Sequence, residues 1–268
     1  MKISRIWVWS SILAALLMGW VSYLGITQKD TYAQESLNWA TQAIGQDYVN
    51  LFLALPAILI CSYFLLRGSL RAYLVWLGVL VYMIYSYVLY AFFVHFGPNF
   101  LIYVAILGLS FYSAAGSLME FDLGNPIDAF HNVRIAFPRA LLAAIGIAFY
   151  FLWLNDIIRA LLSDSLPSGV SETGLAVNPI QVMDMAFILP GSLIASYLLG
   201  QKKLGGYIFA VPLLVFFSIM GVAIIAMFQV LAMKGFPSSP AQSLMMGVIV
   251  LLAVITVFDF LRNTNETD

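Results

Sequence analysis

The chain has 268 residues, of which 62% are hydrophobic and only 9% are charged, and its mean hydropathy is +0.95. A soluble globular domain is about 25% charged and 45–50% apolar, so this composition predicts an integral membrane protein whose apolar surface faces lipid. The net charge of −1 argues against a nucleic-acid partner, and the single cysteine, Cys61, excludes an intramolecular disulfide.

Eight apolar runs are long enough to cross about 30 Å of hydrocarbon as helices. They lie at about 6–25, 48–66, 73–95, 100–119, 140–158, 180–200, 206–232 and 242–261. The first run follows Lys2 and Arg5, as in a signal peptide, but it is long and no small-x-small cleavage site follows at once. We therefore expect a retained membrane helix, and an all-α membrane protein with eight transmembrane helices.

Three segments between the predicted helices have their own character. Residues 36–45 read SLNWATQAIG, which is typical of a short interfacial helix on the outer side. Residues 120–139 contain Gly-Asn-Pro and Phe-Pro turn signals and form the predicted inner linker. Residues 163–178 are rich in Ser, Gly and Thr and predict a mobile outer loop.

The basic residues predict the orientation of the chain. With the N-terminus in the cytoplasm, the inner segments hold Lys2, Arg5, Arg67, Arg71, Arg134, Arg139, Lys202, Lys203 and Arg262, and the outer segments hold Lys29, Arg159 and Lys234. Because cytoplasmic loops of membrane proteins carry an excess of Lys and Arg, both termini are predicted to be cytoplasmic.

Two stretches of the sequence are nearly the same. Residues 55–73 read LPAILICSYFLLRGSLRAY, and residues 189–207 read LPGSLIASYLLGQKKLGGY, at an offset of 134, which is half of 268. Identical residues occur at Leu55, Pro56, Leu59, Ile60, Ser62, Tyr63, Leu65, Leu70 and Tyr73 of the first copy.

Four helices in each half is an even number, so both halves would cross the membrane in the same direction. We therefore predict two parallel four-helix repeats, residues 1–119 and 140–268, joined by the cytoplasmic linker 120–139. Chance similarity between two apolar helices is the alternative.

The same offset aligns polar residues near the outer ends of two predicted helices. It places Asp47 opposite Gln181, and Asn50 opposite Asp184, and each pair shares one helical face at spacing i, i+3. Intramembrane carboxylates usually point into the bundle or into a wet cavity. The pattern predicts an outward-facing polar vestibule between the halves, with Asp184 as the deepest acid. Asn155 and Asp156, at the end of the fifth predicted helix, reach the same level.

Some of these polar groups have a structural alternative. Asp47 immediately precedes a predicted helix and is a plausible N-cap, and Asn178-Pro179 is typical of an N-cap followed by the first helical residue. Asp184 lies six residues after Asn178, too far along to cap.

Tyr82 lies deep in the third predicted helix, where its hydroxyl needs a partner. Asn50 or Asp184 would be a suitable acceptor, and simple core packing of the ring is the alternative. The tyrosine is therefore a further candidate for the polar site.

Two prolines are hinge candidates. Pro56 and Pro190 lie inside predicted helices and cannot donate to the carbonyls of Phe52 and Ala186, four residues earlier. The resulting bends either serve packing alone or act as hinges beside carbonyls that line a path.

No metal or cofactor site is predicted. His95 and His131 lie on opposite predicted faces of the membrane, so they cannot share a haem or a metal ion. No lysine lies in the middle of a predicted helix, and no phosphate-binding loop or nucleophile elbow is present.

The strings QDYVNLFLALP, RGSLRAYLVWLG and YVAILGLS, and later NPIQVMDMAFILP and LGGYIFAVPLLVF, resemble a family of bacterial multi-pass membrane proteins with no assigned activity. The resemblance covers roughly residues 46–110 and 178–217. It implies a membrane class and a bacterial source, hence the bacterial inner membrane, and it assigns no functional residue.

Three functions remain open. The first is movement of a small solute, cation or proton between the repeats, with Asp184 and Asp47 at the outer mouth. The second is a non-catalytic scaffold or sensor subunit whose protein partner is unknown. The third is a membrane enzyme acting on a lipid or quinone-like substrate, for which the sequence offers acids but no convergent base and nucleophile.

Overall fold

The structure is a computed structural model that describes residues 3–121, 129–237 and 239–266. All regular structure in these ranges is helical, and eight helical segments are long and apolar enough to cross a membrane. The predicted all-α class is confirmed, as is the number of candidate membrane-spanning segments. Lys2 and residues 122–128 of the predicted linker lie outside the described residues.

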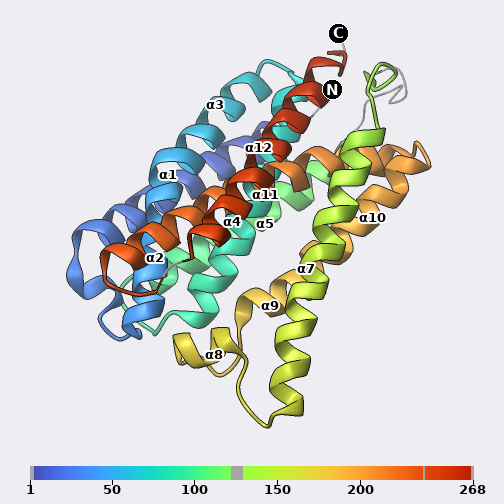
Figure 1. Cartoon of the computed structure of the whole chain (residues 1–268). Coiled ribbons are helices and arrows are strands. Elements are labelled where there is room, and N and C mark those ends of the chain that lie inside the picture. Colours follow the sequence, from blue (N-terminus) through green and yellow to red (C-terminus); the bar gives the residue numbers. More distant parts are fainter. Residues whose placement is uncertain (1–2, 122–128, 238, 267–268) are drawn as a thin grey trace.

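The first four candidate spans occupy the N-terminal half of the chain (Figure 1). Their elements are α1 (Arg5–Thr27), a short 3-10 helix η1 (Lys29–Tyr32), α2 (Leu37–Val49), the π-helical segment η2 (Asn50–Ala54), α3 (Leu55–Leu65), α4 (Leu70–Phe93) and α5 (Phe100–Met119). The second candidate span is continuous from Leu37 to Leu65 and comprises α2, η2 and α3.

The other four candidate spans follow the same order. Their elements are α7 (Ala136–Leu162), the short helix α8 (Ser168–Thr173), α9 (Pro179–Met183), the π-helical segment η3 (Asp184–Ile188), α10 (Leu189–Gly200), α11 (Leu204–Met233) and α12 (Pro240–Arg262). The sixth candidate span, from Pro179 to Gly200, comprises α9, η3 and α10.

The structure corrects two predictions about segments that the sequence places on the outer side. Residues 36–45 are not a separate interfacial helix, because α2 begins at Leu37, is capped by Ser36 and continues without a break into the membrane-length segment. Asp47 is therefore not an N-cap, since it lies in the last turn of α2. The predicted loop 163–178 contains the short helix α8.

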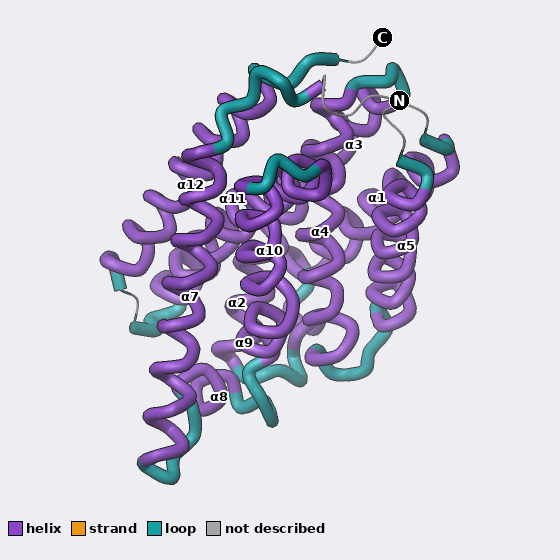
Figure 2. The backbone as a smooth tube through the Cα atoms, turned by 90° about the vertical axis from the view of Figure 1, so that its right-hand side faces the viewer, coloured by secondary structure: helices purple, strands orange, loops and turns teal. Residues whose placement is uncertain are grey.

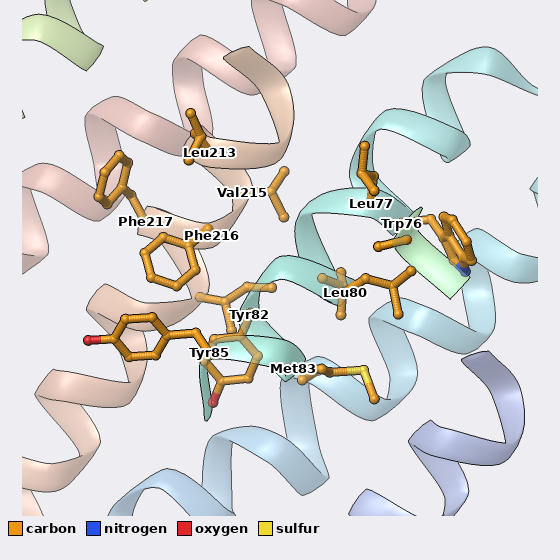
Figure 3. Close-up of a cluster of buried hydrophobic side chains, with 14 of the residues drawn as sticks. Trp76, Leu77, Leu80, Tyr82, Met83, Tyr85, Leu213, Val215, Phe216 and Phe217 are labelled. Carbon is orange, nitrogen blue, oxygen red and sulfur yellow. The ribbon is translucent and has the colours of Figure 1, made fainter. Parts of the chain in front are cut away.

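Helices α4 and α11 form the centre of the molecule and are the most buried of the candidate spans. Figure 3 shows side chains of both helices, including Tyr82 and Phe216, packed in one cluster. Gly78 permits this contact, because a Cβ at that position would lie 2.6 Å from the Cβ of Val215. Helix α11 also packs along α2, where a Cβ on Gly45 would lie 2.6 Å from the Cα of Met227. The two halves of the chain thus meet along α11.

The helices that surround α4 and α11 are arranged differently in the two halves. In the first half α1 packs closely against both α5 and α3. In the second half α7 packs mainly on α10, α12 packs along α11, and the contact between α7 and α12 is limited. Figures 1 and 2 show the C-terminal end of α7 projecting beyond the ends of the other long helices, and Figure 1 shows α7 diverging from α12.

Several elements begin 134 residues apart. The π-helical segments begin at Asn50 and Asp184, α3 and α10 begin at Leu55 and Leu189, and α4 and α11 begin at Leu70 and Leu204. Proline is the second residue of both α3 and α10. The local backbone conformation around the two similar stretches is therefore the same in both halves.

Candidate functional site

A cavity of about 490 Å³ lies beside the seam between the two halves. Its walls come from α2, α4, α7, α8, α9, η3, α10, α11 and α12. Two of these helices, α7 and α12, diverge from each other (Figure 1). Three carboxylates, Asp156, Glu172 and Asp184, line it, and none of the described lining residues is Lys, Arg or His. The cavity is therefore acidic, and its field favours positively charged occupants.

Asp184 lines this cavity, and two side-chain hydrogen bonds fix the orientation of its carboxylate. It begins the π-helical segment η3, and its side chain is half-buried. Its Oδ1 accepts a hydrogen bond from the Tyr85 hydroxyl at 2.9 Å, and its Oδ2 accepts one from Trp153 Nε1 at 2.9 Å. Both donors are neutral, so they orient the carboxylate without neutralising it. Since each carboxylate oxygen has two acceptor positions, Asp184 can still bind a cation.

Gln46 contributes a second polar group to the cavity. Its side chain lines the wall on α2, and the residue is only 4% exposed. Its Nε2 is buried and has no hydrogen-bond partner within the described chain. Because Nε2 itself is buried, this amide nitrogen is part of the packed wall and is not open to an occupant of the cavity.

Hydrogen bonds of Asp156 and Gln181 connect the C-terminal part of α7 to α8 and α9. Asp156 Oδ2 accepts from Gln181 Nε2 at 2.9 Å, and its Oδ1 accepts from the hydroxyl of Ser168 at 3.2 Å and from the backbone N–H of Ser168 at 3.4 Å. Asp156 lines the cavity, but its oxygens are engaged in holding α8 and α9. Neighbouring Asn155 is exposed and also lines the cavity.

Asp47 lies outside this cavity, in an enclosed site of the first half. Its side chain is 1% exposed, its Oδ2 accepts from the Tyr32 hydroxyl at 2.6 Å, and its Oδ1 accepts from the Tyr90 hydroxyl at 3.0 Å. Gly25 of α1 lies so close to Asp47 Oδ2 that a Cβ would collide with it. Burial, followed by the nearby Asp47 carboxylate, raises the pKa of Tyr32 well above its ordinary value, so this hydroxyl remains a donor.

Asn50 and Tyr82 belong to the same enclosed region. The Tyr82 hydroxyl donates to Asn50 Oδ1 at 2.8 Å, which is one of the two pairings expected from the sequence. Asn50 Nδ2 donates to the Ser22 hydroxyl at 3.2 Å. All three side chains are buried, and none of them lines the cavity.

The candidate residues are thus divided between two places. Asp184, Asn155 and Asp156 line the cavity, with Gln181 bonded behind Asp156. Asp47, Asn50 and Tyr82 are sealed among α1, α2 and α4. The difference follows from the helix packing, because α1 closes on α5 and α3 whereas α7 stands away from α12.

The two prolines follow widened turns of their helices. In η3 the N–H of Leu189 bonds to the carbonyl of Asp184, five residues earlier. Continuing that spacing, the donor for the carbonyl of Met185 would be residue 190, which is proline and has no N–H. The Tyr150 hydroxyl of α7 takes its place and donates to the Met185 carbonyl at 2.8 Å. The satisfied carbonyl is one residue earlier than the i−4 rule predicts, because the turn is one residue wider.

Several cavity residues were not among the sequence candidates, namely Gln46, Tyr85, Trp153 and Glu172. Trp153 lies three residues before Asp156 and therefore shares its helical face, so this spacing could have predicted that Trp153 lies at the site. Gln46 and Asp47 are consecutive, so their side chains point about 100° apart, and one reaches the cavity while the other enters the sealed site. The sequence could not predict which of the two side chains reaches the cavity, because that depends on which helix packs against each face of α2.

The described residues contain no cluster of three or more His, Cys, Asp or Glu side chains that could hold a metal ion. Asn178 accepts from the backbone N–H groups of Ile180 and Gln181, so the predicted cap of α9 is confirmed.

Comparison of the chain with protein-family models, with curated proteins and with solved structures gives no match. The resemblance to a bacterial membrane-protein family therefore stays a prediction.

Proposed function

We propose that the chain is a multi-pass protein of the bacterial inner membrane that binds a small cationic solute or a proton at Asp184 and moves it along the seam between its halves. The proposal depends chiefly on the environment of the Asp184 carboxylate, which faces an acidic cavity and accepts hydrogen bonds only from neutral donors. Ionisable groups within membrane helices are rare and usually mark a path for ions or protons.

The proposal includes two parallel four-helix repeats with both termini in the cytoplasm. The offset of 134 residues between the two π-helical segments and between the helices that follow them supports a tandem duplication. The excess of basic residues in the segments on the side of the termini supports the orientation. In this arrangement the cavity opens toward the outer face, since α8 and the start of α9 line its end.

The two repeats have different roles in the proposal. The first repeat encloses Asp47 and Asn50 in hydrogen bonds and provides a rigid support for α11. The second repeat carries the accessible acid on η3, and π-helical turns are frequent at functional sites. Pro190 and the wide turn beside Asp184 give this helix a place to bend when the solute passes.

The test is a flux assay with the full chain in proteoliposomes. Protons, sodium, potassium, ammonium and tetramethylammonium are supplied in turn, and ion movement is followed with a pH-sensitive dye and ion electrodes. We expect flux of at least one of these cations, and we expect Asp184→Asn to lower it by about tenfold or more, because the substitution removes the charge but keeps the side-chain size.

The matched control is Asp164→Asn, which makes the same change in charge at an exposed position that does not line the cavity. Asp164 has a φ of 49°, a conformation that Asn adopts readily. Absence of flux for every cation would remove transport as the function and favour a scaffold or sensor subunit. Equal flux in the Asp184→Asn and Asp164→Asn variants would show that Asp184 is not the group that binds the cation.

A further inference from the structure

The shape and lining of the cavity narrow the class of solute. A metal ion alone is held by several oxygen ligands at short distance, about six to eight for calcium. The described residues offer no such cluster, and the oxygens of Asp156 are already bonded to Gln181 and Ser168. A volume of about 490 Å³ instead falls among pockets that hold small organic molecules, roughly 300–1,000 Å³.

Most of the cavity wall is apolar and adaptable. Four methionines, Met220, Met227, Met245 and Met246, line it, together with several phenylalanines and aliphatic side chains of α11 and α12. Methionine is flexible and polarisable, and it is common on surfaces that accept apolar groups of varied shape. A strongly hydrated ion gains nothing from such a wall, whereas an apolar substituent does.

The polar end of the cavity combines a carboxylate with aromatic rings. Tyr85 and Trp153 both line the cavity and hydrogen-bond to Asp184, so a cation at this carboxylate lies beside a phenol and an indole. Organic ammonium groups are attracted to aromatic faces as well as to carboxylates.

We infer that the cavity binds an amphiphilic organic cation, with its charged group at Asp184 and its apolar part along the methionine-lined wall of α11 and α12. This inference rests on the proposed function and specifies its substrate class. It also explains why an acidic cavity is lined mainly by apolar side chains, since each end of such a molecule requires one of these surfaces.

The test measures binding rather than flux, with tetraphenylphosphonium as the probe. Isothermal titration calorimetry is done on the full chain in lipid nanodiscs, with empty nanodiscs subtracted. We expect saturable binding that Asp184→Asn weakens by about tenfold or more and that Asp164→Asn leaves unchanged. Tetraphenylborate has the same shape and the opposite charge, and we expect no saturable binding of it.

A second pair of variants leaves Asp184 in place. Met245→Arg puts a positive charge on the cavity wall, whereas Leu244→Arg puts it on a neighbouring side chain that is 71% exposed and does not line the cavity. We expect the first variant to abolish tetraphenylphosphonium binding and the second to retain it. Retained secondary structure and elution volume show that loss of binding is not loss of fold.

The outcomes separate this inference from the proposed function. If flux of a small cation depends on Asp184 while tetraphenylphosphonium does not bind, the proposed function stands and the amphiphilic class is wrong. If tetraphenylborate binds as well as its cationic counterpart, the cavity does not select by charge and the inference is overturned. Equal binding to the Asp184→Asn and Asp164→Asn variants overturns it too.

Discussion

At the scale of single residues, Asp47 and Asp184 differ in what surrounds them. Asp47 is enclosed by two tyrosine hydroxyls and by the backbone of Gly25. Asp184 is oriented by Tyr85 and Trp153 but faces a cavity. The same chemical group is therefore structural in one half and available to a ligand in the other.

Gly25→Ala tests the sealed site. The added Cβ would collide with Asp47 Oδ2 and lie 2.8 Å from the Tyr32 hydroxyl, so we expect a loss of about 1–3 kcal/mol in unfolding free energy. The measurement is unfolding of the purified chain in mixed detergent micelles. Gly108→Ala, in α5, is the matched control, since nothing lies within 4 Å of its Cβ position. Equal stability of the two variants would contradict the close approach.

At the scale of elements, the widened turn before Pro190 depends on a side chain of another helix. The Tyr150 hydroxyl of α7 donates to the carbonyl of Met185, five residues before Pro190, which has no N–H of its own. This bond links α7 to η3 close to Asp184, so it also positions the cavity wall.

Tyr150→Phe should therefore lower the unfolding free energy by about 1–2 kcal/mol, because it leaves a carbonyl without a donor. Tyr197→Phe, at a residue that is 62% exposed, should have almost no effect. In a Pro190→Ala background a backbone N–H becomes available, so we expect Tyr150→Phe to be less damaging there. Strict additivity of the two changes in a double-mutant cycle would show that the carbonyl and the proline are unrelated.

At the scale of the whole molecule, eight candidate spans place the beginning of α1 and the end of α12 on one side. Hydrogen bonds agree with this, since Ser4 N–H donates to Glu120 at the end of α5, and Ser69 at the start of α4 donates to Glu266. The loop between α7 and α9, which contains α8, belongs to the opposite side.

Reporter fusions test that arrangement in cells. We expect alkaline phosphatase fused after Ser165 or after Gly235 to be active, because five and seven spans precede these points and place them outside. Fusions after Lys203 or after Glu266 should be inactive, since an even number of spans returns the chain to the cytoplasm. Activity in the reverse pattern would invert the topology and put the cavity on the cytoplasmic side.

Much of the architecture follows from the sequence alone. Apolar runs of membrane length must form helices in lipid, since every backbone group has to be satisfied within its own segment, and all eight candidate spans are present. The cap at Asn178 was also predictable, because a short polar side chain before Pro179 allows few solutions. For Tyr82 the sequence named two possible partners, Asn50 and Asp184, and the structure shows Asn50.

The division between sealed and open sites was decided only by the tertiary structure. The sequence aligns Asn50 with Asp184 and makes them equivalent, since local conformation depends on nearby residues and both begin a π-helical segment. Whether such a group is enclosed or faces a cavity depends on helices distant in the chain, here the close contact of α1 with α5 and the divergence of α7 from α12. Periodicity determines which residues share a helical face, but only packing determines what that face meets.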